Sequence, residues 1–311
     1  MSGYSLATEC ASSREQRHRF GRLTLLSDYW VLTKPEVNFL ILITTCVGFY
    51  LGSANEGRPF SFVRLFNTLL GTLLVASGTG TLNQYIERKF DAQMRRTARR
   101  PAASGRLKPA LVMSFGLALA AAGSIYLAAA VNLLASTLAL LTLLTYLFLY
   151  TPLKRKTPLS VLVGAFPGAM PPLIGWAAAS GGPHIEAGKL WALLFLWQLP
   201  HFMAIAWIYR EDYERAGYMV LPRGKNRVPF VIVQTMLPLI CLVALSITKF
   251  PTEPLASYCA GVLLSAGFFY VGVEFVMRRS RMAARRLLVA SILYLPLLFG
   301  LTATFRWGSK M

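Results

Sequence analysis

The segment LLVASGTGTLNQYIERKFDAQMRRTARRP, residues 73–101, begins as an apolar run and ends in a dense group of charges. Asn83, Glu87 and Asp91 stand four residues apart where the apolar run ends. On a helix, positions i, i+4 and i+8 drift by only about 40° per step, so these side chains share one face over roughly 12 Å. The segment therefore predicts a membrane helix that carries a ladder of three oxygen ligands to the membrane surface.

The residue types in this ladder suit one chemistry and leave one alternative. Carboxylate and amide oxygens suit Mg²⁺, which usually binds through one or two carboxylates plus the phosphates of a substrate. The arginines that follow can hold phosphate oxygens through two parallel hydrogen bonds. The alternative is a solvated helix face whose acids pair with nearby arginines. Because ionisable groups at the end of an apolar helix are costly, we favour a Mg²⁺-dependent diphosphate site.

The composition of the whole chain excludes a soluble domain. Among its 311 residues, 55% are hydrophobic and 14% are charged, and the mean hydropathy is +0.51. Such a chain is a polytopic membrane protein, and we expect an all-α fold with nine transmembrane helices. The segments long enough to cross about 30 Å of hydrocarbon are 37–54, 61–82, 110–130, 133–151, 159–180, 189–209, 229–248, 255–276 and 287–305.

The basic residues orient these helices. One side of the membrane receives 26 of the 32 Lys and Arg residues, in the N-terminal segment and in regions 83–109, 152–158, 210–228 and 277–286. By the positive-inside rule this side is cytoplasmic, as in a multi-pass protein of the bacterial inner membrane. The same topology accounts for most of the net charge of +19, so we do not expect nucleic acid as a partner. Anionic membrane lipid is the partner that such loops attract.

The N-terminal segment is polar and basic. It lacks the apolar core and small-residue cleavage site of a signal peptide, but its Ser and Arg content leaves a mitochondrial presequence open as the less favoured reading. We expect residues 1–33 to form a cytoplasmic tail and residues 34–311 to form a single nine-helix domain. Lys34-Pro35 marks the start of the first membrane helix, because proline at the first helical position costs no hydrogen bond.

A second acidic cluster ends the sixth predicted helix at the same membrane level. It consists of Glu211, Asp212 and Glu214. If both helices line one cavity, the two clusters can hold one or two Mg²⁺ ions on a single diphosphate. A solvated helix end is the alternative interpretation. In the loop between the fourth and fifth helices, Lys154-Arg155-Lys156 lies between two prolines and can either bind a phosphate or only anchor the topology.

Two further features lie inside predicted spans. His201 is a candidate axial ligand for a haem, although a single His in an apolar helix is more often hydrogen-bonded to a neighbour. The segment 166–176 holds three prolines and two glycines, and broken helical backbone at membrane depth is tolerated where it is buried or lines a cavity. It either shapes a substrate pocket or forms a proline-kinked packing surface.

Taken together, these motifs resemble the protohaem IX farnesyltransferase (haem O synthase) branch of the UbiA superfamily of intramembrane prenyltransferases. The resemblance runs from about Lys34 to the last helix. The residues that carry it are Asn83, Glu87, Asp91, Met94, Arg96, Thr97, Arg100 and Pro101, then Tyr150-Thr151-x-x-Lys154-Arg155, then Pro200-His201-Phe202 and Tyr209-Arg210-Glu211-Asp212-Tyr213-x-x-Ala216-Gly217-Tyr218-Met219-x-x-Pro222.

The family resemblance implies nine helices around a central cavity open to lipid, and it implies a reaction. Farnesyl would pass from farnesyl diphosphate to the 2-vinyl group of haem B, and water would add, giving haem O for haem-copper terminal oxidases. It implies Mg²⁺ held by Asn83, Glu87 and Asp91, with Asp212 and Glu211 completing the metal site. The diphosphate would be gripped by Arg96, Arg100, Lys154 and Arg155, with a hydrogen bond from Tyr150.

The sequence departs from the wider superfamily in its second motif. That motif is a DxxxD pair, whereas Ile208 and Ala216 stand four residues either side of Asp212, which leaves a second metal ion in doubt. Glu87 stands where many relatives have Asp. Two other functions remain alternatives: prenyl transfer to an aromatic quinone precursor and, less favoured, membrane transport. Haem A synthase or oxidase assembly factors are possible protein partners.

Overall fold

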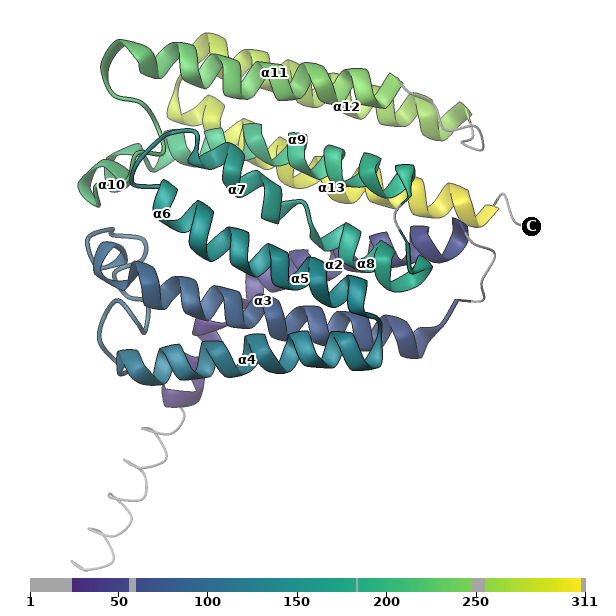
Figure 1. The fold of residues 1–311 in the computed structure, drawn as a ribbon. Helices are drawn as coiled ribbons and strands as arrows, with labels where there is room; N and C mark the ends of the chain where they lie inside the picture. Colours follow the sequence, from purple (N-terminus) through teal and green to yellow (C-terminus); the bar gives the residue numbers. More distant parts are fainter. Residues whose placement is uncertain (1–23, 56–59, 183, 248–254, 309–311) are drawn as a thin grey trace, which may run out of the picture.

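The structure is a computed structural model that describes residues 24–55, 60–182, 184–247 and 255–308, and in these residues it is helical throughout, with no strand (Figure 1). Residues 24–32 form an N-terminal helix that precedes the elements labelled in the figure. The others are α2 (Pro35–Asn55), α3 (Phe62–Asp91), α4 (Pro109–Ala130), α5 (Leu133–Leu144), η1 (Thr145–Tyr150), α6 (Thr151–Leu153), α7 (Ser160–Gly168), α8 (Pro171–Ser180), α9 (Ile185–Ile208), α10 (Arg210–Arg215), η2 (Gly224–Asn226), α11 (Arg227–Ile247), α12 (Leu255–Arg278) and α13 (Arg281–Gly308).

The predicted nine-helix membrane fold is confirmed. Over the described ranges, nine helical segments are long and apolar enough to cross a membrane, and each overlaps one predicted span. Three of these segments are composite: α5, η1 and α6 form the fourth, α7 and α8 form the fifth, and η2 and α11 form the seventh. The helix α3 is 30 residues long and runs past the apolar run to Asp91, so the whole ligand ladder lies on its last turns.

Two interruptions break the α-helical pattern, one in the fourth span and one in the fifth. Residues 145–150 form a π-helix, in which hydrogen bonds span five residues, and such segments are frequent at functional sites. In the fifth span α7 ends at Gly168 and α8 begins at Pro171, as the proline-rich segment predicted. Backbone groups at the break are satisfied locally, because the N–H groups of Ala169 and Met170 donate to the carbonyls of Ala165 and Pro167. Gln198 on α9 donates a further hydrogen bond to the carbonyl of Ala165.

Close approach of helices depends on small residues. A Cβ atom added to Gly78 on α3 would lie 2.6 Å from the backbone nitrogen of Ala120 on α4. A Cβ added to Gly175 on α8 would lie 2.0 Å from the carbonyl oxygen of Thr45 on α2. Without a hydrophobic force between helices in lipid, such contacts are a main source of packing energy.

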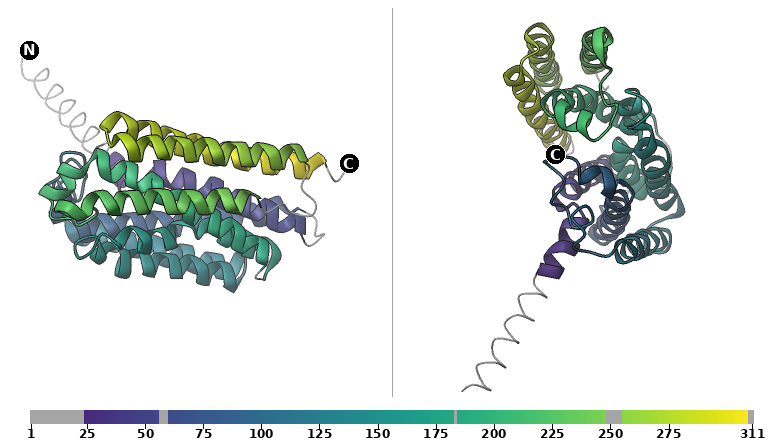
Figure 2. Two further views of the ribbon diagram at one scale, coloured as in Figure 1. Left: turned by 90° about the horizontal axis from the view of Figure 1, so that it is seen from above. Right: turned by 90° about the vertical axis from the view of Figure 1, so that its left-hand side faces the viewer.

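The bundle has two halves, each with its own core. One core joins α9, α11, α12 and α13, and the other joins α2, α3, α4, α5 and α8. Viewed along the helices, α11 and α12 lie on the opposite side of the bundle from α3 and α4 (Figure 2). The seam between α2 and α13 is thin, since these two helices touch at few points.

The N-terminal helix was not anticipated from the sequence, which predicts only a polar tail for residues 1–33. Residues 1–23 lie outside the described part of the chain, but residues 24–32 are helical and Leu32 is fully buried. Leu32 packs against three residues that follow the ladder or begin α4, namely Ala102, Leu107 and Val112. The end of the predicted tail is therefore part of the folded domain.

Candidate active site

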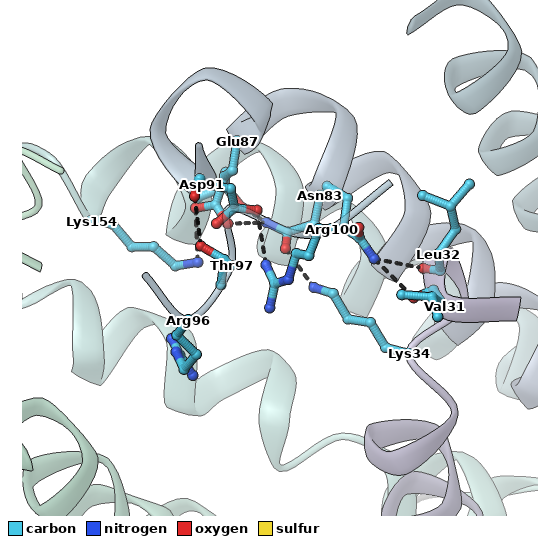
Figure 3. Close-up of polar contacts among 12 residues, drawn as sticks. Val31, Leu32, Lys34, Asn83, Glu87, Asp91, Arg96, Thr97, Arg100 and Lys154 are labelled. Atoms are coloured by element: carbon cyan, nitrogen blue, oxygen red, sulfur yellow. Dashed lines mark hydrogen bonds and ion pairs between the residues drawn. The ribbon is translucent and has the colours of Figure 1, made fainter. Parts of the chain in front are cut away.

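The ladder predicted on α3 is buried, and its three members face the same side (Figure 3). Asn83 and Asp91 are each 1% exposed and Glu87 is 6% exposed. Burying ionised carboxylates requires partners that compensate the lost hydration. Each member has such a partner, and each partner comes from a different part of the chain.

The two carboxylates form buried ion pairs. The ammonium of Lys154 lies 2.9 Å from Oε1 of Glu87, and the guanidinium of Arg100 lies 2.8 Å from Oδ2 of Asp91. The loop that carries Arg100 is held in place by Thr97, whose hydroxyl donates to the carbonyl of Asp91 at 2.9 Å. The site thus joins the end of α3 to the loop after it and to the turn after α6.

The amide of Asn83 is oriented by its neighbours. Its Nδ2 donates to Oε2 of Glu87 at 3.0 Å and to the hydroxyl of Thr151 at 3.3 Å. The amide oxygen is therefore turned the other way, where it accepts a hydrogen bond of 2.7 Å from the ammonium of Lys34. Lys34 is the residue immediately before α2.

The cations outnumber the acids in this group. Lys34, Lys154 and Arg100 surround Glu87 and Asp91. Burial, together with the charges of Arg100 and Lys154, lowers the pKa of Lys34 to about 7. The pKa of Lys154 is raised well above its usual value by Tyr150 and Glu87, although burial opposes its charge. An excess of positive charge at a buried site favours an anionic ligand.

The remaining predicted diphosphate ligands lie around this centre. Tyr150 lies beside Lys154, whose ammonium is 4.4 Å from the centre of its ring. Arg96 donates a hydrogen bond of 3.2 Å to the hydroxyl of Tyr213, and its guanidinium also lies over the ring of Tyr209. Arg155 lies over the ring of Phe90, 4.1 Å from its centre. Arg96 and Arg155 are exposed, so they border the buried group without entering it.

The structure does not bring the second acidic cluster onto the ladder. Asp212 pairs with Arg215 at 3.0 Å, Glu211 pairs with Arg210 at 3.5 Å, and Glu214 pairs with Arg227. The part of the chain that the structure describes contains no group of three or more His, Cys, Asp or Glu side chains able to hold a metal ion. The second cluster instead connects to the site through Tyr213 and Arg96.

His201 lies away from the ladder, on α9. Its Nδ1 is 2.8 Å from the hydroxyl of Ser291 on α13, and the ring of Trp197 stacks on it with centres 5.2 Å apart. Trp197 also donates to the carbonyl of Ser291. This arrangement matches the hydrogen-bonded alternative for His201 and leaves its second ring nitrogen, Nε2, without a described hydrogen bond.

Three residues of the site were missed by the sequence interpretation. The sequence predicts Lys34 only as the start of a helix, and it assigns Thr151 no role. Tyr218 is 4% exposed, and its hydroxyl has no hydrogen-bond partner in suitable geometry. Burial raises the pKa of Tyr218, and the nearby Glu87 carboxylate raises it further. Nothing in the local sequence marks Lys34, because its contact with Asn83 spans 49 residues.

The donor set of the ladder fits Mg²⁺. It offers two carboxylates and one amide oxygen on a single helix face, all hard ligands, and Mg²⁺ takes the rest of its coordination from water and substrate phosphates. Asn83, Glu87 and Asp91 are the residues that would hold the ion. The surrounding cations suit the phosphates that would accompany it.

A helical membrane bundle with a buried, cation-rich carboxylate site at one end defines an intramembrane enzyme that acts on an anionic substrate. The chain belongs to the UbiA prenyltransferase family, which it matches over residues 41–302. It is 44% identical over 291 residues to the protein named Protoheme IX farnesyltransferase of Solibacter usitatus, an overlap of 91% of this chain and 100% of that one. It is 37% identical over 273 residues to the mitochondrial Protoheme IX farnesyltransferase of Arabidopsis thaliana, covering 86% of this chain and 62% of that one.

Solved structures share the fold at low sequence identity. A digeranylgeranylglyceryl phosphate synthase aligns with a TM-score of 0.72 at 16% identity, covering 90% of this chain and 98% of that one. A UbiA homologue from Archaeoglobus fulgidus, bound to GPP and Mg²⁺, aligns with a TM-score of 0.61 at 15% identity, covering 88% and 99%. The membership of this family that the sequence motifs predict is confirmed.

Proposed function

We propose that this protein transfers farnesyl from farnesyl diphosphate to the 2-vinyl group of haem B and that water adds, giving haem O and diphosphate. The observation that carries the proposal is the buried acid ladder of α3 faced by three cations, in a chain 44% identical to a protein named Protoheme IX farnesyltransferase. The ladder supplies sites for a metal and the cations supply sites for phosphate oxygens. The assignment of haem as the acceptor rests on the names of the relatives.

The reaction breaks the bond between C1 of farnesyl and the diphosphate oxygen. The electron pair stays with diphosphate, so negative charge builds up on the leaving group in the transition state. Lys154 and Arg100 lie where they can take this charge, because each is held next to the ladder by a carboxylate. Fixed charges that need no rearrangement stabilise a transition state efficiently.

The vinyl carbon of haem then bonds to the allylic cation, and water captures the positive charge left on the acceptor and loses a proton. An apolar cavity wall must keep water away from the allylic cation until the carbon–carbon bond has formed. The membrane-spanning helices supply such a wall below the ladder. Mg²⁺ held by Asn83, Glu87 and Asp91 would supply further neutralisation of the leaving diphosphate.

His201 is proposed to contact the haem. Ser291 fixes the ring through Nδ1, and this leaves Nε2 as the nitrogen available to an axial position. Asp212 and Glu211 are proposed to approach the metal site only after the α10 segment moves, since their carboxylates now pair with arginines.

The proposed setting is the inner membrane of a bacterium, with the N-terminus and the site-bearing loops in the cytoplasm. Relatives of this name occur both in bacteria and as a mitochondrial protein. The proposed product serves haem-copper terminal oxidases, so haem A synthase or oxidase assembly factors are the proposed protein partners.

The test uses detergent-purified protein with haem B, farnesyl diphosphate and Mg²⁺, with and without EDTA. Mass spectrometry is expected to show haem that has gained one farnesyl group and one hydroxyl group, and EDTA is expected to abolish this product. If aromatic quinone precursors give product and haem does not, the acceptor assignment is wrong. If no acceptor gives product with folded protein, the prenyl transfer itself is contradicted.

A further inference from the structure

Lys34 is a partly buried cation that forms no ion pair with a carboxylate in the described residues. Glu87 is paired with Lys154 and Asp91 is paired with Arg100, whereas Lys34 bonds to the neutral amide oxygen of Asn83. Within the described residues no carboxylate forms an ion pair with Lys34. A partly buried charge that lacks an opposite charge is costly unless a ligand supplies one.

The backbone at Lys34 is held in an unusual conformation. Its φ is 54°, in the left-handed region that a residue with a side chain seldom adopts. Pro35 follows, and proline disfavours the ordinary helical conformation in the residue before it. The N-terminal helix therefore stops here, and the chain turns into α2. Such strained positions persist only when the surroundings fix them, and they cluster at ligand sites.

The surroundings that fix this turn come from residues of α3 beside the ladder. Gln84 donates hydrogen bonds to the carbonyls of Val31 and Leu32, at 3.1 Å and 3.2 Å (Figure 3). Thr81 also donates to the carbonyl of Leu32. These are carbonyls at the end of the N-terminal helix that have no partner inside it. The helix end is thus anchored one residue away from Asn83.

A second attachment holds the other part of the N-terminal helix. Asp28 accepts hydrogen bonds from Nε and Nη2 of Arg106, at 3.0 Å and 2.8 Å, a paired geometry. Arg106 also donates to the carbonyl of Arg99, next to Arg100 in the loop that pairs with the ladder. We call this pair the Asp28–Arg106 clasp. It ties the helix that delivers Lys34 to the loop that delivers Arg100.

We propose that Lys34 is a direct ligand of the substrate's diphosphate and that the Asp28–Arg106 clasp is what positions it. The proposal rests on the proposed function and adds a ligand to its diphosphate site. The four-carbon stem of Lys34 lets its ammonium swing from the Asn83 oxygen to a phosphate oxygen. That movement frees the amide oxygen at the moment when a metal arrives with the diphosphate.

The experiment measures the binding of inorganic pyrophosphate to purified full-length protein by calorimetry, once with Mg²⁺ and once with EDTA. The variants are Lys34→Met, which keeps the length without the charge, and Arg106→Gln, which opens the clasp far from the ligand. The matched controls are Lys89→Met and Arg285→Gln, which remove exposed cations from α3 and α13. Thermal unfolding of every variant shows that it is folded.

Lys34→Met is expected to weaken pyrophosphate binding about 10- to 100-fold, the effect of losing a charged hydrogen bond. The weakening is expected both with Mg²⁺ and with EDTA, because Lys34 contacts the anion itself. Arg106→Gln is expected to weaken binding about threefold to tenfold, and both controls are expected to bind as the parent protein does.

Unchanged pyrophosphate binding by Lys34→Met would overturn the proposal, as would a weakening that disappears in EDTA, since Lys34 would then act only through the metal. Unchanged binding by Arg106→Gln would overturn the role of the clasp. These results are separable from the fate of the proposed function, because haem farnesylation by the parent protein is scored independently. Pyrophosphate binding that depends on Lys34, in a protein that farnesylates no haem, would contradict the haem acceptor and leave Lys34 as a diphosphate ligand.

Discussion

At the scale of single residues, the negative charges of the two acids in the ladder are already compensated by ion pairs with cations. Asp91 is almost fully buried, and Arg100 is the side chain that offsets its charge. Breaking a buried pair by removing one charge leaves the other uncompensated, which is worse than never having had the pair. Substitutions that keep the shape and remove only one charge are therefore the most informative.

Asp91→Asn is expected to lower farnesyl transfer by about 100-fold or more, because the substitution removes a carboxylate that pairs with Arg100 and is proposed to hold Mg²⁺. Haem binding is expected to be largely retained, since His201 lies on another helix. The measurements are the transfer rate and the change in haem absorbance on titration. Glu274→Gln is the control, because it removes an ion-paired acid between α12 and α13 away from the ladder. Loss of haem binding in Asp91→Asn would contradict this division of roles.

Tyr218→Phe removes a buried hydroxyl that has no partner, so stability is expected to stay equal or rise by up to about 1 kcal/mol. We expect this hydroxyl, which lies near Glu87, to donate to a phosphate oxygen of the substrate, so transfer is expected to fall about tenfold when it is removed. Tyr126→Phe is the contrasting variant, because it removes a hydroxyl that does have a partner: the hydroxyl of Tyr126 donates to the amide oxygen of Asn67 at 2.9 Å. Both residues are far from the ladder in sequence. Tyr126→Phe is expected to lose about 1 kcal/mol of stability and no activity. Unfolding midpoints and rates measured for both variants test the contrast, and full activity in Tyr218→Phe would refute it.

At the scale of elements, the π-helix η1 and its neighbour α7 place two of the site's side chains. The π-helix ends at Tyr150, and Thr151 follows it. The hydroxyl of Thr151 accepts a hydrogen bond from the amide of Asn83 and donates one to the carbonyl of Tyr146. The ring of Tyr150 lies directly against Gly164 on α7. Because the ammonium of Lys154 packs on the ring of Tyr150, a shift of that ring also displaces Lys154.

Gly164→Ala is expected to destabilise the protein by about 1–3 kcal/mol, because the new methyl group would lie 2.5 Å from the ring of Tyr150. Transfer activity is expected to fall as well, since the ring must shift. Gly267→Ala on α12 is the matched control: nothing lies within 4 Å of its Cβ position, and it is expected to gain about 0.5–1 kcal/mol. The measurement is the unfolding midpoint in one detergent together with the transfer rate. If Gly164→Ala is as stable as Gly267→Ala, the ring of Tyr150 can move away from residue 164 at no cost and the prediction is wrong.

The elements also show what sequence can and cannot predict. Nine spans and the helical ladder follow from hydropathy and four-residue spacing, which are local properties of the chain. The contact of Lys34 with Asn83 and the pairing of Asp28 with Arg106 join residues 49 and 78 positions apart, and no local pattern encodes them. The acids near Asp212 follow the end of α9 as the sequence predicts, but the break between α9 and α10 and their pairing with arginines are not encoded in any local pattern.

At the scale of the whole molecule, the bundle is two packed halves with a thin seam between α2 and α13. The site-bearing turns gather at one end, where the basic loops also lie. A farnesyl chain and a haem are both largely apolar, so a lateral path from lipid suits them better than a path from water. The arrangement supports the proposal that the phosphate end stays at the cytoplasmic surface.

The topology is tested by single cysteines placed in a variant without the four native cysteines. Lys156→Cys lies in the basic turn after α6, and Glu186→Cys lies at the start of α9 at the other end of the bundle. A maleimide that cannot cross membranes is expected to label Lys156→Cys only in inverted vesicles and Glu186→Cys only in right-side-out vesicles. The positive-inside rule gives this orientation. The reverse pattern of labelling would place the ladder on the outer face.

The position of Lys34 in the chain also bears on how the site is assembled during synthesis. Lys34 leaves the ribosome before Glu87 and Asp91 do. Arg100 follows Asp91 by nine residues, whereas Lys154 does not appear until 67 residues after Glu87. While α3 inserts into the bilayer, Glu87 has no Lys154 to pair with. Lys34, which in the folded protein bonds to Asn83 on α3, has by then already been synthesised. The residue that is proposed to bind the diphosphate is therefore the earliest part of the site to be made.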